Sequence, residues 1–355
     1  MAKYPVKHLD VSGFGPFAGA NIECSSQLNV IVGDNGCGKT QLLKLLYAAT
    51  KSLRGTKKLI DRHKSYDQPT KTELRGEIAD KLDGVFRPDS LGRLVRRGQG
   101  RSKCSVEVKY EGIGSPLGFD FSSRAQKEVD VVDLPGSRLK DEPVYIPPHE
   151  LLTLSQTFIT IFESVEADFD ETWYDTSKLL KKPPLKGRRT KHSSPLASLF
   201  SELLGDGTVS ESDSGRFYLH QPGVGNLEAT LLAEGHRKLA MISRLIANGT
   251  LLEGGYLFWD EPEANLNPAS QKAVANALIL LASQGAQVFV ASHSLYLIRE
   301  LQMAENAPDI QYIGLYRPEG SATAVEAQTS HDLDDIEVFA ALEAEAEQAE
   351  RYLAW

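Results

Sequence analysis

Cysteine is scarce in this sequence, and its placement excludes two classes of site. The 355 residues include three cysteines, Cys24, Cys37 and Cys104, which show no metal-binding spacing and cannot form a disulfide framework. Cys37 falls inside a glycine-rich loop, where we interpret it as a small loop residue. The sequence therefore predicts neither a cysteine-based metal site nor a disulfide-stabilised scaffold.

Long apolar runs and sequence repeats are also missing. No stretch approaches the ~18 to 20 apolar residues that a membrane helix needs, and the start MAKYPVKHLD lacks the apolar core of a signal peptide. There is no sustained heptad pattern and no internal repeat. Hydrophobic residues still make up 41% of the chain, enough for a large core. We expect a cytoplasmic protein of about two domains that makes no membrane contact.

The net charge of −9 excludes a polycation, but the charges are segregated along the chain. Basic clusters lie at residues 51–64 and 93–103 and at Lys181, Lys182, Lys186, Arg188, Arg189 and Lys191. Such clusters suit contacts with DNA or RNA phosphates, and solvated loops are the alternative. Residues 332–350 carry eight carboxylates and no lysine or arginine. Their apolar residues recur at helical spacing, which predicts an amphipathic helix packed on the rest of the chain or on another protein.

The most informative motif is a glycine-rich loop between an apolar run, residues 28–32, and a helix-forming segment, residues 41–49. This order is that of a P-loop, in which backbone N–H groups surround the phosphates of a nucleoside triphosphate. Lys39 would reach the β and γ oxygens, and the Thr40 hydroxyl would bind Mg²⁺. The predicted nucleotide-binding residues of this loop are Gly33, Asp34, Asn35, Gly36, Cys37, Gly38, Lys39, Thr40 and Gln41.

A second motif ends the apolar run at residues 256–259 with two carboxylates, Asp260 and Glu261. This pattern is typical of a Walker B strand. Asp260, at the end of a buried parallel strand, is placed to hold Mg²⁺, and Glu261 is placed to polarise the attacking water as general base. Two acids that merely cap a strand are the alternative, and the Pro-Glu-Ala-Asn-Leu-Asn-Pro that follows is not an ordinary turn.

Residues 260–268 resemble the Walker B motif and D-loop of ABC-type ATPase heads, as in the SMC, RecF and OLD families. Two further motifs fall in matching order. Residues 232–238 resemble the signature motif in its Ser-Glu-Gly variant, although Ala233 replaces the usual serine and Glu234 replaces a glycine. Residues 287–291 predict a buried strand, and the Ser292-His293-Ser294 that follows resembles the switch-histidine turn. A satisfied structural histidine at a strand end is the alternative for His293.

The resemblance implies a composite site. In such heads two protomers enclose two ATP molecules, and each P-loop faces the partner's signature motif. Lys39, Glu261 and His293 would be catalytic, with His293 as the sensor of the γ-phosphate, and Thr40 and Asp260 would hold Mg²⁺. The residues that would complete the partner's site are Ala233, Glu234, Gly235, His236 and Asn265. The implied cofactors are ATP and Mg²⁺.

The predicted fold is α/β, a P-loop NTPase with a mostly parallel sheet, built as an ABC-type head with an antiparallel β arm and a helical insertion. Because 221 positions separate Lys39 from Asp260, a large segment is inserted between the two motifs. The predicted parts are an N-terminal ATPase lobe at 1–150, a helical variable insertion at 151–215, a C-terminal ATPase lobe at 216–330 and an acidic helix at 331–355.

Within these parts the pattern predicts several elements. From residue 76 onward, short alternating runs such as 104–110 and 117–121 predict antiparallel hairpins. Residues 151–180, 234–247 and 269–282 predict helices, and residues 310–316 predict a strand. No glutamine stands where the family's Mg²⁺-sensing loop begins, so His149 and Glu150 are the candidates there. Phe14 or Phe17 is either a core residue or a platform for adenine.

The resemblance extends to the small head-only ATPases of the AAA_21 and OLD-like group in bacterial anti-phage systems such as Septu or PARIS. It implies that ATP binding and hydrolysis switch a partner effector, a nuclease or toxin, through ATP-dependent homodimerisation. A DNA repair or recombination ATPase, a transporter nucleotide-binding subunit and an ATP-binding scaffold without turnover are the alternatives. An OLD-type nuclease would need a Toprim domain, and although Asp332-Leu333-Asp334 fits its Asp-x-Asp letters, little sequence follows His293.

Overall fold

The computed structural model describes residues 2–55, 68–98, 101–164, 169–185, 194–252, 254–321, 323–336 and 340–355. Most of the basic cluster at 51–64, and the cluster members Lys186, Arg188, Arg189 and Lys191, lie outside the described residues. None of the helices within the described ranges combines the length and apolar character that a membrane span requires.

A mixed sheet lies at the centre of the described structure, with the strand order β14-β13-β3-β12-β11-β7. Its strands are β3 (Leu28–Gly33), β7 (Pro143–Ile146), β11 (Gly255–Asp260), β12 (Ala286–Ala291), β13 (Ile310–Tyr316) and β14 (Glu326–Ser330). All neighbours pair in parallel except β13 and β14. The five parallel strands are almost continuously buried, as strands covered on both faces must be.

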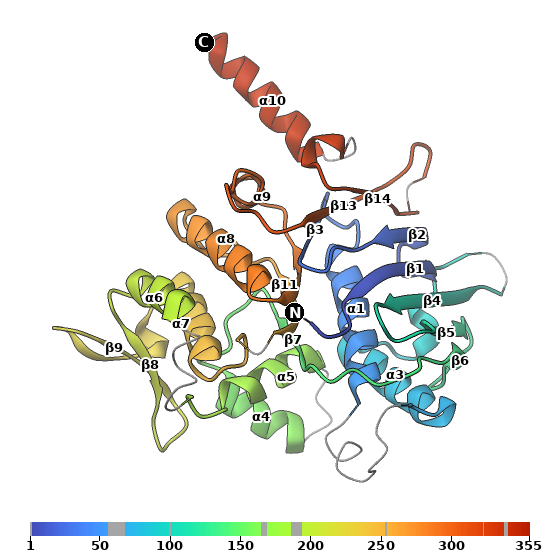
Figure 1. Ribbon diagram of the computed structural model, residues 1–355, viewed down its shortest axis with the longest axis horizontal. Coiled ribbons are helices and arrows are strands. Elements are labelled where there is room, and N and C mark those ends of the chain that lie inside the picture. Colours follow the sequence, from blue (N-terminus) through green and yellow to red (C-terminus); the bar gives the residue numbers. More distant parts are fainter. Residues whose placement is uncertain are drawn as a thin grey trace.

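Alternate residues of the central strands enter two different cores. Ile31 and Phe258 pack with the helix α1 (Lys39–Arg54) on one side of the sheet. Val30 and Trp259 pack on the other side with α7 (Glu234–Ala247), α8 (Pro268–Ser283) and α9 (Leu295–Gln302). Figure 1 shows α8 and α9 on one side of the central strands and α1 on the other. The strands and helices predicted with definite bounds in both ATPase lobes are confirmed within one or two residues, except that α1 is longer at both ends. The start of the β hairpins differs from the prediction, as described below.

The β arm is a second sheet, antiparallel throughout, with the order β2-β1-β4-β5-β6. Its strands are β1 (Val6–Phe14), β2 (Phe17–Glu23), β4 (Lys103–Tyr110), β5 (Leu117–Ser122) and β6 (Asp130–Asp133). Phe14 and Phe17 are buried in its core, and the Phe14 ring packs edge-on against Phe86 at 5.3 Å. These two aromatic rings are therefore core residues, and the adenine-platform interpretation is wrong.

The expectation that hairpins begin at residue 76 is also wrong, because the helix α3 (Lys71–Phe86) covers that region. Thr70 and Glu73 form a capping box at its start, with the Thr70 hydroxyl accepting from the Glu73 N–H at 3.2 Å. Leu74, Ile78 and Leu82 recur every four residues and are buried. Both signals are present in the sequence, and together they define a helix rather than a strand. A single 3₁₀ turn, η1 (Leu91–Leu94), follows it.

The insertion is not one continuous helix over 151–180. It contains α4 (Ser155–Ser164), α5 (Glu171–Leu180) and α6 (Ser194–Leu203). The Asp170 side chain accepts from the Thr172 N–H at 2.8 Å and starts α5 anew. A small antiparallel sheet of β8 (Thr208–Glu211), β9 (Phe217–Gln221) and β10 (Gly225–Glu228) then leads through η3 (Ala229–Leu231) into α7. The central sheet takes strands from both predicted ATPase lobes. The four-part division of the chain stays a prediction.

The described part of the acidic segment contains a 3₁₀ turn and a helix. It starts with a 3₁₀ turn, η4 (Leu333–Asp335), whose Leu333 is buried. The helix α10 (Ala340–Leu353) then extends away from the body, as Figure 1 shows. Its described side chains are exposed, and an ion pair at 3.8 Å joins Glu345 to Arg299 of α9. Extensive packing of α10 on its own head is thus not observed, and packing on another protein stays a prediction.

The buried amide of Gln287 joins the β arm to the central sheet. Its Oε1 accepts from the Val6 N–H at 2.8 Å, and its Nε2 donates to the carbonyls of Val6 and Ser25 at 2.7 and 2.8 Å. Gln287 lies on β12 and is fully buried, so these polar groups satisfy each other without water.

We expect Gln287→Met to lower the free energy of unfolding by about 3 kcal/mol, because the similar-sized thioether leaves buried backbone groups without partners. Chemical denaturation measures this value. Gln284→Met is the matched control, since Gln284 is exposed and follows α8 directly. Equal stability of the two variants would contradict a joining role for Gln287.

Candidate functional site

The glycine-rich loop connects the end of β3 to the start of α1. Gly33 has φ 143°, and a Cβ there would lie 2.3 Å from the Leu315 carbonyl oxygen. Gly38, the N-cap of α1, has φ 86°, and a Cβ there would lie 2.8 Å from the Pro16 ring. Only glycine fits at both places. The backbone N–H groups at this helix start carry the positive end of the helix dipole, which favours an anion.

Polar side chains already contact this loop from two directions. Lys39 folds back and donates to the carbonyl oxygens of Gly33 and Asp34 at 2.7 and 3.1 Å. Arg317, just after β13, donates to the Gly36 carbonyl at 2.9 Å. Arg317 was not foreseen from the sequence, where no motif marks it. Asp34, Asn35 and Gly36 are exposed, whereas Cys37 is buried at 2% exposure.

The two predicted metal ligands lie in contact. Thr40 Oγ1 donates to Asp260 Oδ1 at 3.1 Å, across 220 positions of sequence. Asp260 is 2% exposed, and its Oδ2 accepts from the Tyr145 hydroxyl at 3.1 Å. Burial raises the pKa of Asp260 to about 6, the Thr40 and Tyr145 hydrogen bonds oppose this, and the Glu261 charge adds to it. Neither the place of Tyr145 in the central sheet nor the contact of its hydroxyl with Asp260 was foreseen from the sequence.

The turn after β11 brings Glu261 near His293. Their side chains are 37% and 52% exposed, and His293 Nδ1 lies 3.8 Å from Glu261 Oε1. Glu261 and Asn265 have φ values of 44° and 62°; this left-handed conformation is strained for Glu261, whereas asparagine adopts it more readily. A strained backbone at the candidate base agrees with a functional turn.

Glu263 fixes the switch-histidine turn and was not foreseen. It is 5% exposed, and its Oε1 accepts from the Ser292 hydroxyl at 2.8 Å and from the N–H groups of His293 and Ser294 at 3.0 and 3.2 Å. His293 Nδ1 lies 3.4 Å from the same oxygen. The sequence feature that could have identified Glu263 is the Pro-Glu that directly follows Asp260-Glu261, but the interpretation of the motif gave Glu263 no role.

The predicted signature turn packs on the D-loop of its own chain. A Cβ on Gly235 would lie 2.5 Å from the Asn265 carbonyl oxygen, so the backbones approach closely there. Ala233 and His236 are exposed at the start of α7. Figure 1 places α7, which begins in the signature turn, and α1, which follows the P-loop, on opposite sides of the central strands.

His149 and Glu150 contact the signature turn rather than the Walker residues. Glu150 Oε1 pairs with Arg237 Nε at 2.8 Å, and His149 Nδ1 lies 3.7 Å from Glu234 Oε1. The two pairs join the segment that follows β7 to the start of α7. The role of His149 or Glu150 in place of the Mg²⁺-sensing glutamine of the family stays a prediction.

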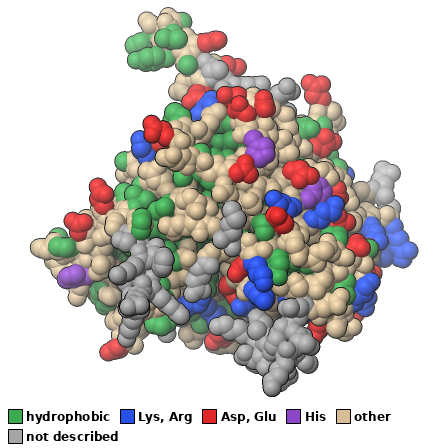
Figure 2. Space-filling view, viewed as in Figure 1, with side chains coloured by type: hydrophobic (Ala, Val, Ile, Leu, Met, Phe, Trp, Pro, Cys, Tyr) green, Lys and Arg blue, Asp and Glu red, His purple; other side chains and the backbone are tan. Residues whose placement is uncertain are grey.

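Some described members of the basic clusters are paired with acids. Lys51 and Arg54 pair with Glu142, Lys103 pairs with Asp120, and Lys181 pairs with Glu211. Figure 2 shows Lys and Arg side chains among acidic ones on the β-arm side of the face in view. Nucleic-acid binding by these clusters stays a prediction.

The Asp-x-Asp letters of an OLD-type nuclease do not mark a metal site in the described ranges. There, no group of three or more His, Cys, Asp and Glu side chains could hold a metal ion. Asp334 instead lies 3.2 Å from Arg299, and Asp332 accepts from the Asp334 N–H at 3.1 Å.

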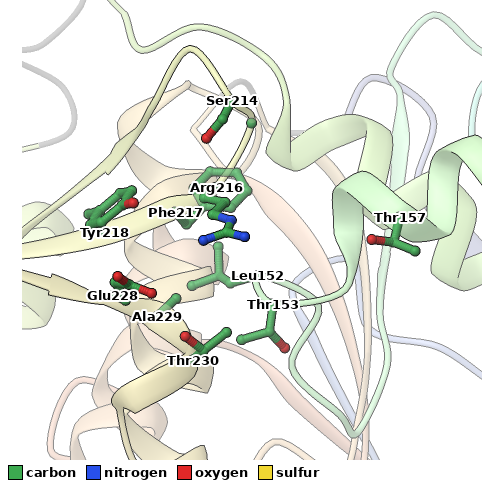
Figure 3. Close-up of a pocket in the computed structure, with 11 residues that line it drawn as sticks. Leu152, Thr153, Thr157, Ser214, Arg216, Phe217, Tyr218, Glu228, Ala229 and Thr230 are labelled. Carbon is green, nitrogen blue, oxygen red and sulfur yellow. The ribbon is translucent and has the colours of Figure 1, made fainter.

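A separate hollow of about 400 Å³ lies between the insertion and the small sheet. Leu152, Thr153 and Thr157 line it from one side, and Ser214 to Tyr218 and Glu228 to Thr230 line it from the other. Figure 3 shows the Arg216 side chain between these two walls. The hollow adjoins η3, which leads into the signature turn, and its lining includes none of the predicted site residues.

Comparison with known proteins agrees with this geometry. Residues 28–299, which run from β3 into α9, match a family model described as "AAA domain, putative AbiEii toxin, Type IV TA system". No curated protein sequence matches the chain.

Solved structures share the fold at low sequence identity. One is the crystal structure of the SmcHead bound to the C-winged helix domain of ScpA, with a TM-score of 0.55, 14% identity, and coverage of 94% of this chain and 100% of that chain. Another is the Smc head domain with an extended coiled coil, bound to the C-terminal domain of ScpA derived from Pyrococcus furiosus. It has a TM-score of 0.54, 12% identity, and coverage of 98% and 100%. The predicted α/β head fold is confirmed.

We expect Tyr145→Phe to raise the pKa of Asp260 further, by about one pH unit, because it removes a hydrogen bond that favours the carboxylate. A ¹³C NMR titration of labelled aspartate carboxyls measures this pKa, with Asp260→Asn identifying the resonance. Tyr312→Phe is the control, since Tyr312 is a buried tyrosine on β13. An Asp260 titration that is the same in both variants would contradict the Tyr145 contact.

Proposed function

Because the chain belongs to the AAA_21 family of AAA domains and is an AAA/ABC-type ATPase of the SMC and RecF-like group, we propose that it hydrolyses ATP with Mg²⁺ as an ATP-dependent dimer. The observation that carries this proposal is the contact between Thr40 of the P-loop and Asp260 of the Walker B strand. In P-loop ATPases these two positions meet at the metal.

The oxygen atoms of this contact fit Mg²⁺. Neighbouring ligands of an octahedral Mg²⁺ lie about 3 Å apart, given Mg–O distances of about 2.1 Å. Thr40 Oγ1 and Asp260 Oδ1 are 3.1 Å apart, so a cation could replace their hydrogen bond with little movement. Bound Mg²⁺ would supply charge stabilisation to the phosphates and would favour the ionised form of Asp260.

Lys39 and the P-loop would bind the phosphates. Lys39 would exchange its bonds to the Gly33 and Asp34 carbonyls for the β and γ oxygens. The N–H groups between Gly33 and Gln41 would surround the phosphates. Arg317, on the Gly36 carbonyl, would hold the outer wall of the loop.

Glu261 and His293 would act at the γ-phosphate. Glu261 would take a proton from the attacking water, the water oxygen would bond to the γ-phosphorus, and the bond to the β-γ bridging oxygen would break to give ADP and phosphate. His293 lies beside the Glu261 carboxylate and would sense the γ-phosphate. Glu263 would keep the histidine turn in place through its three hydrogen bonds.

A second copy of the chain would complete the site. The exposed start of α7, with Ala233, Glu234, Gly235 and His236, offers N–H groups to a partner's γ-phosphate, and Asn265 lies next to it. ATP would thus join two copies head to tail, and hydrolysis would release them.

We further place this switch in cytoplasmic anti-phage defence with an effector partner, a nuclease or toxin. The family description names a toxin and a type IV toxin–antitoxin system, which supports this role. Two similar heads were solved bound to ScpA domains, which supports a partner protein. The alternative is a DNA repair or recombination ATPase, which the SMC-head fold favours.

Glu261→Gln should still bind ATP but turn it over at least about a hundredfold more slowly, because the base is lost while the Lys39 and Mg²⁺ contacts remain. Lys39→Ala should instead lose nucleotide binding. Fluorescent-nucleotide titration and phosphate release measure the two effects. Glu319→Gln, in the exposed segment after β13, is the control. Turnover by Glu261→Gln close to that of the control would rule out Glu261 as the base.

Gly235→Arg should keep nucleotide binding but block both ATP-dependent association and turnover, because the new side chain occupies the shared interface and its Cβ displaces the Asn265 carbonyl of the D-loop. Light scattering with ATP and phosphate release measure these effects. Gly76→Arg is the matched control, since a Cβ at Gly76 has no neighbour within 4 Å.

Mixing Gly235→Arg with Glu261→Gln gives a sharper test of the shared site. In the mixed dimer one site combines an intact Glu261 with an intact signature turn, and the other site carries both defects. Partial activity should therefore return on mixing. A strict monomer with full turnover in ATP would refute the composite site.

A further inference from the structure

Lys238 is a buried lysine whose position calls for a physical explanation. It lies on α7, is 1% exposed, and is followed by the apolar residues Leu239, Ala240 and Met241. A buried ammonium group is costly unless it is hydrogen bonded. Its Nζ donates to the carbonyl oxygen of Glu261 at 2.6 Å and lies 3.4 Å from that of Ala264. The ammonium group of Lys238 is therefore hydrogen bonded to the main chain of the candidate base, Glu261, and of its turn.

The segment that Lys238 holds is strained and short. Glu261 adopts a left-handed φ of 44°, and such strain persists only where surrounding contacts impose it. On one side, the Glu261 N–H donates to the Ala291 carbonyl of β12 at 2.9 Å. On the other side, Lys238 binds the Glu261 carbonyl. The peptide groups on either side of Glu261 are thus held from two different elements.

The same helix carries the signature turn. Gly235 lies one helical turn before Lys238, and its Cα approaches the Asn265 carbonyl so closely that a Cβ would clash at 2.5 Å. The start of α7 therefore contacts the 261–265 turn at two points, through the backbone of Gly235 and through the Lys238 hydrogen bonds. Rigid helices that contact two sites in this way are a physical route for coupling.

We propose that Lys238 is a positioning residue that sets the backbone of Glu261 and couples it to the signature turn of the same chain. The inference rests on the proposed ATPase function. In the dimer, the signature turn of one chain would contact the ATP held by its partner, while Glu261 of that chain would act on its own ATP. Lys238 thereby links the occupancy of one composite site to the placement of the base in the other.

The first experiment compares Lys238→Met with the wild-type protein. We expect kcat to fall between about tenfold and a hundredfold, as for a base misplaced by about 1 Å, while KM and nucleotide affinity stay within about twofold. Lys272→Met is the matched control, because Lys272 lies on α8, its side chain is 60% exposed, and it pairs only loosely with Glu300 at 3.8 Å. Lys238→Gln, which keeps a polar group but shortens its reach, should lose kcat in the same way.

The second experiment asks whether Lys238 acts through Glu261. In the Glu261→Gln background, single-turnover rates should change less than about twofold on adding Lys238→Met, because residues that act as one unit are not additive. Amide hydrogen exchange over residues 261–266 should be faster in Lys238→Met without nucleotide, and unchanged in Lys272→Met.

Three results would overturn the inference. The first is an unchanged kcat in Lys238→Met. The second is a fully additive loss of the single-turnover rate when Lys238→Met is added to Glu261→Gln. The third is a joint fall of kcat, nucleotide binding and melting temperature in both Lys238→Met and Lys238→Gln. The last result would assign Lys238 to folding alone. If the wild-type and Lys272→Met proteins bind ATP but do not hydrolyse it, the proposed function fails, and this outcome is distinct from a failure of Lys238 alone.

Discussion

The strands β3 and β11 both pair with β12 in parallel, and every part of the candidate site depends on this pairing. The register places Ala291 opposite Ile31 on one side and opposite Asp260 on the other. Because parallel strands present their carboxyl ends at one edge, the loops after β3, β11 and β12 emerge side by side. Thr40, at the start of α1, then comes within hydrogen-bond distance of Asp260. The apolar interior of the sheet thus holds the polar site in place.

That placement has an electrostatic consequence, because the site's charges are buried against the core. Asp260, Glu263 and Lys238 are each less than a tenth exposed. Desolvation raises the pKa of Asp260 to about 6 and lowers the pKa of Lys238 to about 8, although nearby carboxylates oppose the change at the lysine. Each group is retained because it has hydrogen-bonding partners on neighbouring elements. The partners keep the geometry fixed before any ligand arrives.

The polar contacts continue from the site into the insertion. The Tyr145 ring, whose hydroxyl binds Asp260, lies 5.3 Å from the Tyr47 ring of α1. The Tyr47 hydroxyl donates to Asp175 of α5 at 2.5 Å, and Asp175 also pairs with Lys81 of α3 at 2.8 Å. Burial alone would lower the pKa of Lys81, but the charges of Asp175 and Glu171 outweigh burial and raise it. A continuous set of contacts therefore joins the Walker B carboxylate to helices of both the β-arm side and the insertion.

What the sequence determined by itself was local. The P-loop, the β11 strand with its two carboxylates and the helix at Glu234–Ala247 are each contiguous segments whose chemistry is set by neighbouring residues. The capping box at Thr70 is also a local signal, but the expectation of hairpins from residue 76 did not use it, and the helix α3 was missed. The fold class followed from the order of these motifs and from their resemblance to ABC-type ATPase heads.

What the tertiary structure decided was which side chains support the site. Tyr145 reaches Asp260 across 115 positions, and Arg317 reaches the P-loop across 281. Lys238 lies only 23 positions from Glu261, yet nothing in the intervening sequence indicates that its ammonium group meets that carbonyl. A lysine, a tyrosine and an arginine carry no spacing signal of their own. Their partners follow from strand register and helix packing, because those alone decide which distant groups are brought within hydrogen-bond distance of each other.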